Sequence, residues 1–444
     1  MYFLYSLLAL SLFVVVSPYF VYQAIRHGKY VGSLRQRLGY LPISFNIDGE
    51  ASIWIHAVSV GEALTARALV ADLRERYPRL RLYLSTTTMA GQDVARRGVP
   101  HVDGVFYFPF DWSVIVKRTL DVVKPQLFIM METEIWPNLL RLCAERGVQT
   151  LLVNGRISSR SYPRYRLIRP FFRRVLAHVD RFCMQSEESA RRLVELGADP
   201  AKVTVTGSLK FDSLPVPSPA PLGKPRERVL RFFRVTPSRV VVMAGSTVKG
   251  EEPAILRAFA RLRLTVPNAL AILAPRHPER FGEVERLARE AGLMTVRRSN
   301  LPIDAEPRAE VVVLDSVGEL AQLYQIATAV FVGGSLVDHG GHNILEPAVF
   351  GKPIIFGPHM RNFKEIAEAF VSNGAAVQLA SERDLDDALL TLITDPVRRA
   401  RLGAAARALV ETNRGAKDKT LKVIGELLPS GAIGGVVRPF RVVH

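Results

Sequence analysis

The sequence predicts an α/β protein of two doubly wound, Rossmann-like domains, on three observations. Short runs rich in Val, Ile and Leu alternate with helical patterns along the chain, which is typical of βα units on parallel sheets. The chain has 444 residues, too many for one ordinary hydrophobic core and enough for two. A stretch with five prolines, residues 213–225, interrupts the alternation and indicates an extended linker between the domains.

The strand candidates fall into two groups on either side of this stretch. The first half has six, at residues 52–58, 81–87, 126–131, 149–154, 181–185 and 203–206. The second half has five, at residues 240–244, 270–274, 311–314, 329–332 and 353–356. Two such domains are expected to face a central cleft lined by strand ends, where α/β sheets usually bind ligands.

These observations predict five segments. In order they are an N-terminal membrane anchor helix at residues 1–25, a first Rossmann-like domain at 26–213, the proline-rich linker at 214–225, a second Rossmann-like domain at 226–427 and a C-terminal tail at 428–444. The tail is rich in Gly and has no periodic pattern, so it is assigned no function.

The first segment is predicted to lie in a membrane. Residues 2–21 carry no charge and approach the ~20 apolar residues that cross a bilayer core. They lack the basic start and the cleavage site of a signal peptide, which favours an uncleaved anchor. Positive residues follow at once, so the body of the protein is expected in the cytoplasm. These residues are Arg26, Lys29, Arg35 and Arg37. Pro18 leaves a kinked or interfacial helix open, and a buried core helix is the alternative.

The overall charge indicates an anionic partner. The formal net charge is +17, from 59 Lys and Arg against 42 Asp and Glu. Residues 155–179 contain seven arginines, no acidic residue and several aromatic residues, which favours docking at anionic lipid headgroups. RNA binding and a solvated helix face are the alternatives, and the anchor favours lipid over nucleic acid. Two cysteines, Cys143 and Cys183, are too few for a disulfide framework and fit a reducing compartment.

Several kinds of site are excluded by motifs that the chain lacks. No G-x-G-x-x-G follows a strand, which argues against a dinucleotide cofactor. Glu251 and Glu252 stand where a phosphate loop needs Lys and then Ser or Thr, which argues against ATP hydrolysis. His339 and His342 lie in a Gly-rich turn without further ligand spacing, so no metal site is predicted.

Three segments of the first half place charged side chains at strand ends. Glu62 follows a Gly turn and opens a helical pattern, where a carboxylate serves either as a cap or as a catalytic base. Glu132 and Glu134 end another strand before a Pro-initiated helix, so that one can cap the helix while the other points inward. Lys210 follows the last strand and is either a cation of the site or a solvated loop charge.

The second half offers groups suited to a nucleotide. Arg276 and His277 follow a strand, and the planar fork of Arg is the better phosphate ligand. Residues 316–320 begin a helix whose backbone N–H groups suit a phosphate or a nucleotide edge. In the Gly-rich stretch 333–347, Asn343 can open a helix and Glu346 can reach a ribose diol; a purely structural Gly turn is the alternative.

Taken in order, seven motifs resemble the 3-deoxy-D-manno-oct-2-ulosonic acid (Kdo) transferase family. They are HAVSVGE, METEIWPN, NGRISSRS, GSLKFD, PRHPERF, VGGS with GGHNILEP, and GPHMRNF, and the match runs from about residue 53 to residue 363. The resemblance implies a GT-B fold, with the acceptor handled by the first domain and CMP-Kdo by the second. One departure is Val248, where relatives often show His.

The resemblance also implies roles for individual residues. Glu62 would be the general base, with Glu132 and Lys210 stabilising the transition state. The CMP-binding residues would be Arg276, His277, Val317, Gly318, Glu319, Asn343, Ile344, Leu345 and Glu346. The reaction would be an inverting transfer of Kdo from CMP-Kdo to lipid IVA, a tetraacyl-disaccharide bisphosphate precursor of lipid A. It would need no metal and no cofactor besides the donor, and it would serve lipopolysaccharide biosynthesis at the inner face of a bacterial inner membrane.

Two classes of alternative remain at this point. One is another GT-B protein that uses a UDP or GDP sugar, either a lipid-directed glycosyltransferase or a sugar-nucleotide epimerase. The other is a non-catalytic membrane adaptor or an RNA-binding protein, for which basic patches would suffice and Glu62 would be dispensable.

Overall fold

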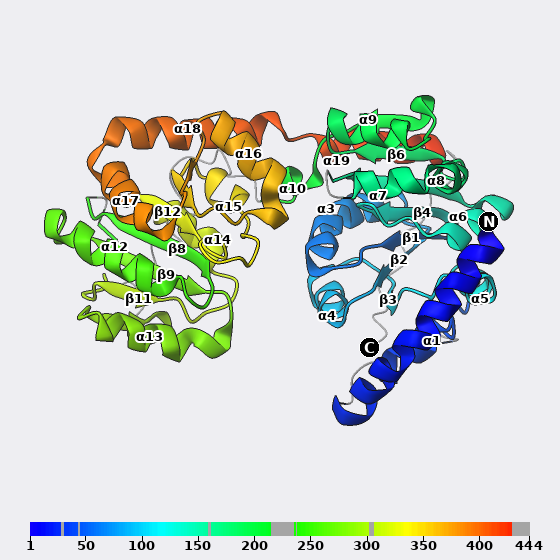
Figure 1. Ribbon diagram of the computed structural model, residues 1–444, viewed down its shortest axis with the longest axis horizontal. Coiled ribbons are helices and arrows are strands. Elements are labelled where there is room, and N and C mark those ends of the chain that lie inside the picture. The colour runs from blue at the N-terminus through cyan, green and yellow to red at the C-terminus, as the bar shows by residue number, and fades with distance from the viewer. Residues whose placement is uncertain are drawn as a thin grey trace. The chain divides into compact units, whose positions relative to one another are not determined.

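The computed structural model describes residues 1–27, 31–42, 45–158, 161–214, 235–236, 238–301 and 306–428. These residues form two compact units, coloured mainly blue to green and green to orange in Figure 1. The first unit runs to Ser213 and resumes at Arg414, and the second comprises what lies between. Within the described residues each unit contains one parallel sheet of seven strands.

The first sheet has the strand order β3-β2-β1-β4-β5-β6-β7, in which the direction of winding reverses between β1 and β4. Its strands are β1 (Ser52–His56), β2 (Arg81–Thr86), β3 (Gly104–Tyr107), β4 (Pro125–Met131), β5 (Gln149–Gly155), β6 (Arg181–Met184) and β7 (Val203–Val205). β1 and β4 are paired in parallel, with Ile55 opposite Ile129. In doubly wound sheets the carboxyl ends of strands at such a reversal are the usual ligand position.

Both faces of the first sheet are covered, so its strands are buried and strongly apolar. Trp54 of β1 packs into one cluster with residues of α5, α6, α8 and α9, whereas Ile53 and Ile55 pack into the other with residues of α3, α4 and α19. The helices are α2 (Val31–Arg37), α3 (Val60–Arg76), α4 (Met89–Gly98), α5 (Ser113–Val123), α6 (Pro137–Glu145), α7 (Tyr162–Leu167), α8 (Arg169–Leu176), α9 (Glu187–Glu195), α10 (Leu209–Asp212) and α19 (Ala416–Leu427).

The second sheet has the order β10-β11-β9-β8-β12-β13-β14 and reverses between β8 and β12. Its strands are β8 (Val241–Thr247), β9 (Leu270–Pro275), β10 (Thr295–Arg297), β11 (Val311–Val313), β12 (Ala329–Val332), β13 (Ile354–Phe356) and β14 (Val377–Gln378). Its helices are α12 (Glu252–Thr265), α13 (Phe281–Glu290), α14 (Leu320–Leu323), α15 (Leu345–Ala348), α16 (Lys364–Ser372), α17 (Leu385–Thr394) and α18 (Pro396–Thr412). Residues of α12, α13, α17 and α18 form the core on one face of this sheet.

The two-unit α/β prediction is confirmed, with differences at the edges. All eleven predicted strands are present within a few residues, and the three that were not predicted, β3, β10 and β14, are short. Helix α19 packs on the first unit, although its residues were predicted in the second domain. The predicted linker and tail lie outside the described residues except for Leu214 and Leu428.

The N-terminal segment forms helix α1 (Tyr2–His27). No helix within the described residues combines the length and the apolar content needed to cross a bilayer, so a membrane-spanning anchor is not supported. The first half of α1 packs on the first unit instead. Tyr2 lies edge-on to Phe171 of α8, with ring centroids 5.9 Å apart, and Phe13 lies 5.1 Å from Trp112.

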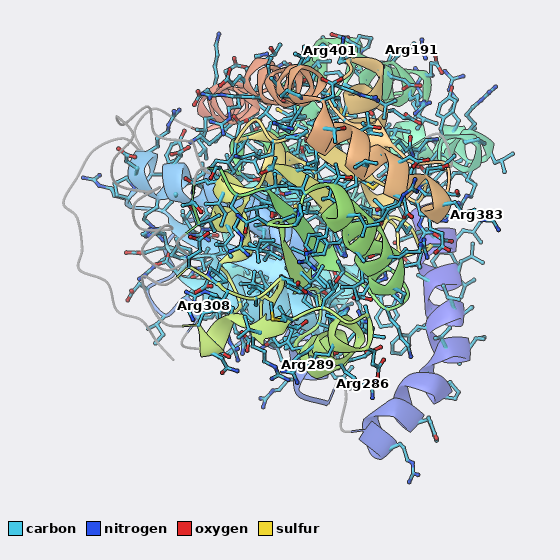
Figure 2. The ribbon with its side chains drawn as sticks, turned by 90° about the vertical axis from the view of Figure 1, so that its left-hand side faces the viewer. Arg191, Arg286, Arg289, Arg308, Arg383 and Arg401 are labelled. Atoms are coloured by element: carbon cyan, nitrogen blue, oxygen red, sulfur yellow. The ribbon has the colours of Figure 1, made fainter. Side chains whose placement is uncertain are left out.

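Positive charge is spread widely over the surface. Figure 2 shows arginine side chains such as Arg286, Arg289 and Arg383 projecting from the second unit. Arg286 and Arg289 of α13 are each paired with a glutamate four residues away on the same helix. The excess of arginine is therefore not confined to residues 155–179, and part of it is offset by local ion pairs.

Candidate active site

In the first unit the carboxylates predicted at strand ends come together at the winding reversal. Glu62 follows β1 and Glu132 follows β4, and these two strands are neighbours in the sheet. Their proximity is evident electrostatically, since the charge of Glu132 raises the pKa of Glu62 in addition to the larger effect of burial. Glu134 joins the group, because its pKa is raised first by burial and then by the charges of Glu62 and Glu132.

Glu62 is held by the turn before α3. Its Oε2 accepts the backbone N–H of Val58 at 2.8 Å, and its Oε1 accepts the hydroxyl of Ser59 at 2.8 Å. Ser59 is the N-cap of α3, and its Oγ accepts the Glu62 N–H in return. The capping contacts predicted for Glu62 are therefore present. Burial nevertheless raises the pKa of Glu62, although these hydrogen bonds act to lower it. An effective general base has a pKa near the working pH, so a raised pKa makes a carboxylate a better base.

Glu132 and Lys210 form an ion pair. Lys210 Nζ lies 3.7 Å from Glu132 Oε1, and both side chains are partly exposed. Glu132 adopts a left-handed backbone conformation, with φ +57°, and its N–H donates to the carbonyl of Val153 on β5. A residue other than Gly is strained in the left-handed region of backbone conformation, and such strained residues are common at functional sites.

Asn154 is a residue of this site to which sequence reasoning gave no role. It lies at the end of β5, is fully buried and has φ +58°. Its Oδ1 accepts the backbone N–H of Leu209 at 3.0 Å, which fixes the start of α10 and hence Lys210. The available signal was an Asn-Gly pair at a strand end, because Asn tolerates the left-handed region better than most residues.

In the second unit the loops after β8 and β12 are joined by the carboxylate of Glu251. Its Oε2 accepts the N–H groups of Val248 and Gly334 at 2.9 and 2.8 Å. Its Oε1 accepts the N–H groups of Ser335 and Leu336, both at 2.9 Å. Glu251 is fully buried, and burial raises its pKa while these four donors oppose the rise. Glu251, which argues against a phosphate loop in the sequence, thus fixes the loops after β8 and β12 at the winding reversal.

Arg276 lies close enough to Glu346 and to His342 to influence the pKa of each, and His277 influences the pKa of His342. Burial raises the pKa of Glu346, and the hydrogen bond from Asn343 and the charge of Arg276 oppose the rise. Burial lowers the pKa of His342 to about 4, assisted by the positive charges of Arg276, His339 and His277. The backbone of Arg276 is tied to β8, since its N–H donates to the carbonyl of Thr247 at 2.9 Å.

The motif Asn343–Glu346 forms a tight turn into α15. Asn343 Oδ1 accepts the Leu345 N–H at 3.1 Å, and its Nδ2 donates to Glu346 Oε1 at 3.2 Å. Asn343 therefore supports the turn that leads into α15, but the N-cap of this four-residue helix is Ile344, so the predicted helix opening by Asn343 is not seen as a cap. Ile344 and Leu345 are fully buried, so the structure presents neither residue to a ligand.

Val317, Gly318 and Glu319 lie between β11 and α14. Val317 is 86% exposed, and Gly318 has φ +93°. Glu319 Oε2 accepts the hydroxyl of Ser316 at 2.6 Å and lies 3.4 Å from Arg298 Nε. Within the described part of the chain, the Glu319 side chain therefore bonds to Ser316 and Arg298 rather than to Arg276 or Glu346. The helix that follows is a single turn that begins at Leu320, at the end of the predicted start 316–320.

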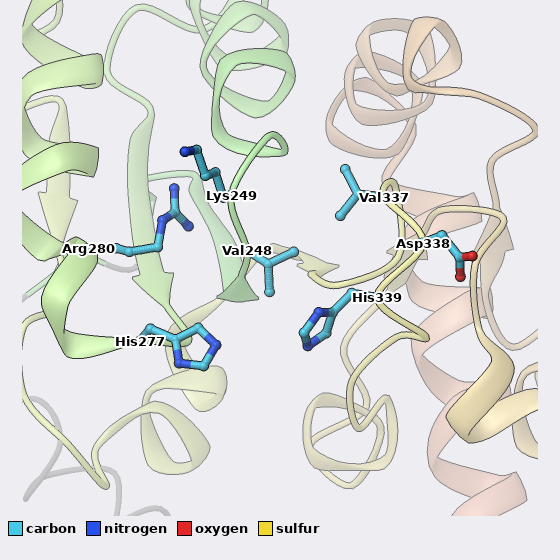
Figure 3. Close-up of a pocket in the computed structure, with 7 residues that line it drawn as sticks. All are labelled: Val248, Lys249, His277, Arg280, Val337, Asp338 and His339. Atoms are coloured by element: carbon cyan, nitrogen blue, oxygen red, sulfur yellow. The ribbon is translucent and has the colours of Figure 1, made fainter. Parts of the chain in front are cut away.

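A pocket of about 280 Å³ opens beside Arg276, and His277 forms part of its wall. Figure 3 shows its walls, with Val248, Lys249, His277 and Arg280 on one side and Val337, Asp338 and His339 on the other. Glu251 therefore holds the two loops that supply Val248 and Val337.

Comparison with known proteins gives matches over most of the chain. A family model described as 3-Deoxy-D-manno-octulosonic-acid transferase (kdotransferase) matches residues 32–213, and one described as Glycosyl transferases group 1 matches residues 240–409. A 3-deoxy-D-manno-octulosonic acid transferase of Haemophilus influenzae is 34% identical over 404 residues, covering 90% of this chain and 92% of the relative. One of Bordetella pertussis is 35% identical over 386 residues, covering 85% of this chain and 88% of the relative.

Among solved structures, the UDP-GlcNAc 2-epimerase from Neisseria meningitidis bound to UDP-GlcNAc is similar in fold. Its TM-score is 0.57 at 13% identity, covering 85% of this chain and 100% of that one. At this identity the likeness concerns the fold alone, two Rossmann-like sheets of the same kind.

Proposed function

Since this chain belongs to the 3-deoxy-D-manno-octulosonic acid (Kdo) transferase family, we propose that it transfers Kdo from CMP-Kdo to a sugar hydroxyl of the lipid A precursor lipid IVA. The chain is a glycosyltransferase, and its two parallel Rossmann-like sheets are consistent with a GT-B fold. The observation that carries the proposal is the group of Glu62, Glu132 and Lys210 at the winding reversal of the first sheet.

In the proposed reaction the acceptor hydroxyl attacks the anomeric carbon of Kdo from the face opposite the phosphate, with inversion. The bond between that carbon and the phosphate oxygen breaks, and CMP leaves with the electron pair. Glu62 takes the proton of the hydroxyl, for which its raised pKa suits it. Lys210, paired with Glu132, supplies positive charge where the transition state gains negative charge.

The second unit would bind the CMP part of the donor. The guanidinium of Arg276 suits the phosphate, and Glu346, oriented by Asn343, suits the hydroxyls of a ribose. The exposed loop at Val317 and Gly318 offers backbone groups and an apolar surface to the base. CMP carries one phosphate, so cations from side chains suffice in this proposal and no metal ion is assigned a role.

We also propose that the protein works at the cytoplasmic face of an inner membrane, lying on the anionic lipid surface. Helix α1 exposes large apolar side chains, among them Leu8 and Leu12, which are 61% and 65% exposed. Its N-terminus packs on α8, where Arg174 Nη1 lies 3.2 Å from the sulfur of Met1. Apolar and basic side chains on adjacent elements favour an interfacial helix. No nucleic acid partner is assigned.

The test is direct. Full-length protein is incubated with CMP-Kdo and lipid IVA, and the added sugars are counted by mass. Melting temperatures with CMP, UDP and GDP identify the nucleotide, because a ligand that binds only the folded state raises the melting temperature. Stabilisation by UDP or GDP in place of CMP would favour a different lipid-directed glycosyltransferase or an epimerase.

A further inference from the structure

The pocket in the second unit has cationic groups to which the proposed function assigns no role. It lies at the ends of β8 and β9 and against the loop after β12 (Figure 3). His277 lines this pocket and directly follows Arg276, and both residues influence the pKa of His342, so the pocket adjoins the proposed phosphate site. Its volume of about 280 Å³ is several times the ~30 Å³ share of one water molecule.

The charges along the pocket wall are not equivalent. Arg280 donates to both oxygens of the buried Glu252, at 2.7 and 3.0 Å, and to Glu283 at 3.0 Å. Its charge is therefore offset by two carboxylates, and it serves to hold α12 and α13 together. Asp338, the acidic residue of the lining, is paired with Arg361 at 3.2 Å.

Lys249 is the cation best placed to meet a ligand. Its side chain is exposed, and its charge helps to lower the pKa of Glu283, after the larger effect of the hydrogen bond from Arg280. His339 stands across the pocket from His277 and adds a second imidazole. Asp338 and Arg280 are already engaged by their ion-pair partners, and His277 lies 3.9 Å from Glu279, so Lys249 is the lining cation left to meet a ligand, beside the two imidazole rings.

The shape of the pocket is fixed before any ligand arrives. Glu251 binds the N–H groups of Val248 on one loop and of Leu336 on the other, next to the lining residues Lys249 and Val337. The loop after β12 also lies directly against the end of β8, since a Cβ at Gly333 would lie 2.5 Å from the carbonyl oxygen of Ser246. A site with fixed walls loses little entropy on binding, which favours recognition of one particular anion.

We propose that this pocket binds the carboxylate of the donor sugar, with Lys249 as its counter-ion and His277 and His339 as hydrogen-bond donors. The inference rests on the proposed function. In CMP-Kdo the carbon that bears the phosphate also bears the carboxyl group, so two anionic groups must be accommodated side by side. Arg276 takes the first and Lys249 the second. The pocket thereby selects an acidic sugar over a neutral one attached to the same nucleotide.

The experiment compares Lys249→Met with Lys249→Arg in the full-length protein. Lys422→Met, which removes an exposed charge on α19, is the matched control. The affinity for CMP is measured by calorimetry, and KM for CMP-Kdo is measured in transfer to lipid IVA. Lys249→Met should raise KM by roughly tenfold to a hundredfold, as expected for a lost charge-assisted hydrogen bond, and leave CMP affinity unchanged. Lys249→Arg, which keeps the charge, should stay within about threefold of the parent.

Other outcomes separate the two proposals. Arg276→Ala should weaken CMP and CMP-Kdo alike, which gives the pattern of a phosphate ligand. If Lys249→Met weakened CMP as much as CMP-Kdo, the pocket would hold the phosphate and the carboxylate assignment would be wrong. An unchanged KM in Lys249→Met would also overturn it. If the parent protein neither bound CMP nor transferred Kdo, the proposed function itself would fail, and the inference with it.

Discussion

Asn154 and Leu209 are joined by a buried hydrogen bond of 3.0 Å, in which the side-chain Oδ1 of Asn154 accepts the backbone N–H of Leu209. Leu209 begins α10, the single turn that carries Lys210, and Lys210 lies 3.7 Å from Glu132. The hydrogen bond of Asn154 goes to the Leu209 backbone and not to the side chain of Glu132 or Lys210. It is therefore a positioning residue, which acts on the proposed chemistry through the start of α10.

Replacing Asn154 with Ala should lower kcat for Kdo transfer and leave CMP affinity unchanged. The Leu209 N–H loses its acceptor in a buried place, which costs about 1–3 kcal/mol of stability and loosens α10. Asn154→Gly is the matched variant, because Gly tolerates φ +58° and isolates the loss of the side chain from backbone strain. Denaturant unfolding, calorimetry with CMP and transfer rates measure the three effects. A normal kcat in the folded fraction of both variants would mean that Asn154 has only a structural role.

Acidic substitutions on the exposed face of α1 should weaken binding to anionic vesicles. Leu8, Leu12 and Val15 are all more than 60% exposed, so a triple change to Glu should leave the packing of Phe13 against Trp112 intact. It removes apolar area and adds charge that anionic lipids repel, so co-sedimentation with vesicles should fall at least about tenfold. Serine at the same three positions is the control that separates lost apolar area from added charge. Undiminished vesicle binding of the Glu variant would show that α1 is not the membrane contact.

The sequence was sufficient to predict both sheets because their central strands are buried runs of Val, Ile and Leu. β10 and β14 are edge strands of three and two residues, too short to show a pattern. α19 was assigned to the wrong unit because its apolar face, with Leu421 and Ile424, suits any sheet, and only the folded chain shows which sheet it covers.

The candidate site likewise has features that the sequence predicts and features that only the folded chain shows. The proximity of Glu62 and Glu132 follows from two strands that each end in a carboxylate motif and lie side by side. The roles of Asn154 and Glu251 do not follow, because their backbone partners Leu209 and Gly334 lie 55 and 83 residues away. A hydrogen bond to a backbone N–H places no requirement on the identity of the partner side chain, so the sequence does not show which residue the partner is.

Glu134 should make the stability of the protein depend on pH. Burial, with the charges of Glu62 and Glu132, raises its pKa to about 7 from an ordinary 4.5. The folded state then binds this proton more tightly than the unfolded state. The stability that this bound proton contributes to the folded state is therefore complete below pH 4.5 and is lost as the pH rises through 7.

Glu134→Gln, which cannot ionise, should remove this loss. The variant should resemble the parent at about pH 4.5 and be more stable by roughly 1–3 kcal/mol at about pH 8.5, by the relation between a pKa shift and free energy. Urea unfolding at the two pH values measures the difference, and Glu75→Gln on the exposed face of α3 is the control. Parallel stability profiles of parent and Glu134→Gln would contradict the assignment.

Glu62→Gln separates the two roles of Glu62. Its carboxylate accepts the Val58 N–H and the Ser59 hydroxyl, both at 2.8 Å. A glutamine keeps one oxygen for Val58, and its amide can donate to Ser59, whose hydroxyl is able to accept. The cap is therefore largely preserved and the melting temperature should change little. A sugar hydroxyl is a poor nucleophile near neutral pH, however, and glutamine cannot take its proton, so transfer should fall by roughly 10²–10⁴-fold with CMP affinity unchanged.

Glu62→Ala completes the comparison, because it removes both the proton acceptor and the cap. It should show the same loss of transfer as Glu62→Gln and, in addition, a stability loss of about 0.5–2 kcal/mol, typical of a lost N-terminal cap. A cap alone predicts a different pattern, in which Glu62→Gln transfers Kdo normally and Glu62→Ala loses activity only in proportion to its unfolded fraction. Melting temperature, CMP affinity and transfer rate, measured on both variants, decide between them. Near-normal transfer by Glu62→Gln would remove Glu62 from the mechanism and leave the proton acceptor to be sought among Glu132 and Glu134, which lie in the same group of carboxylates.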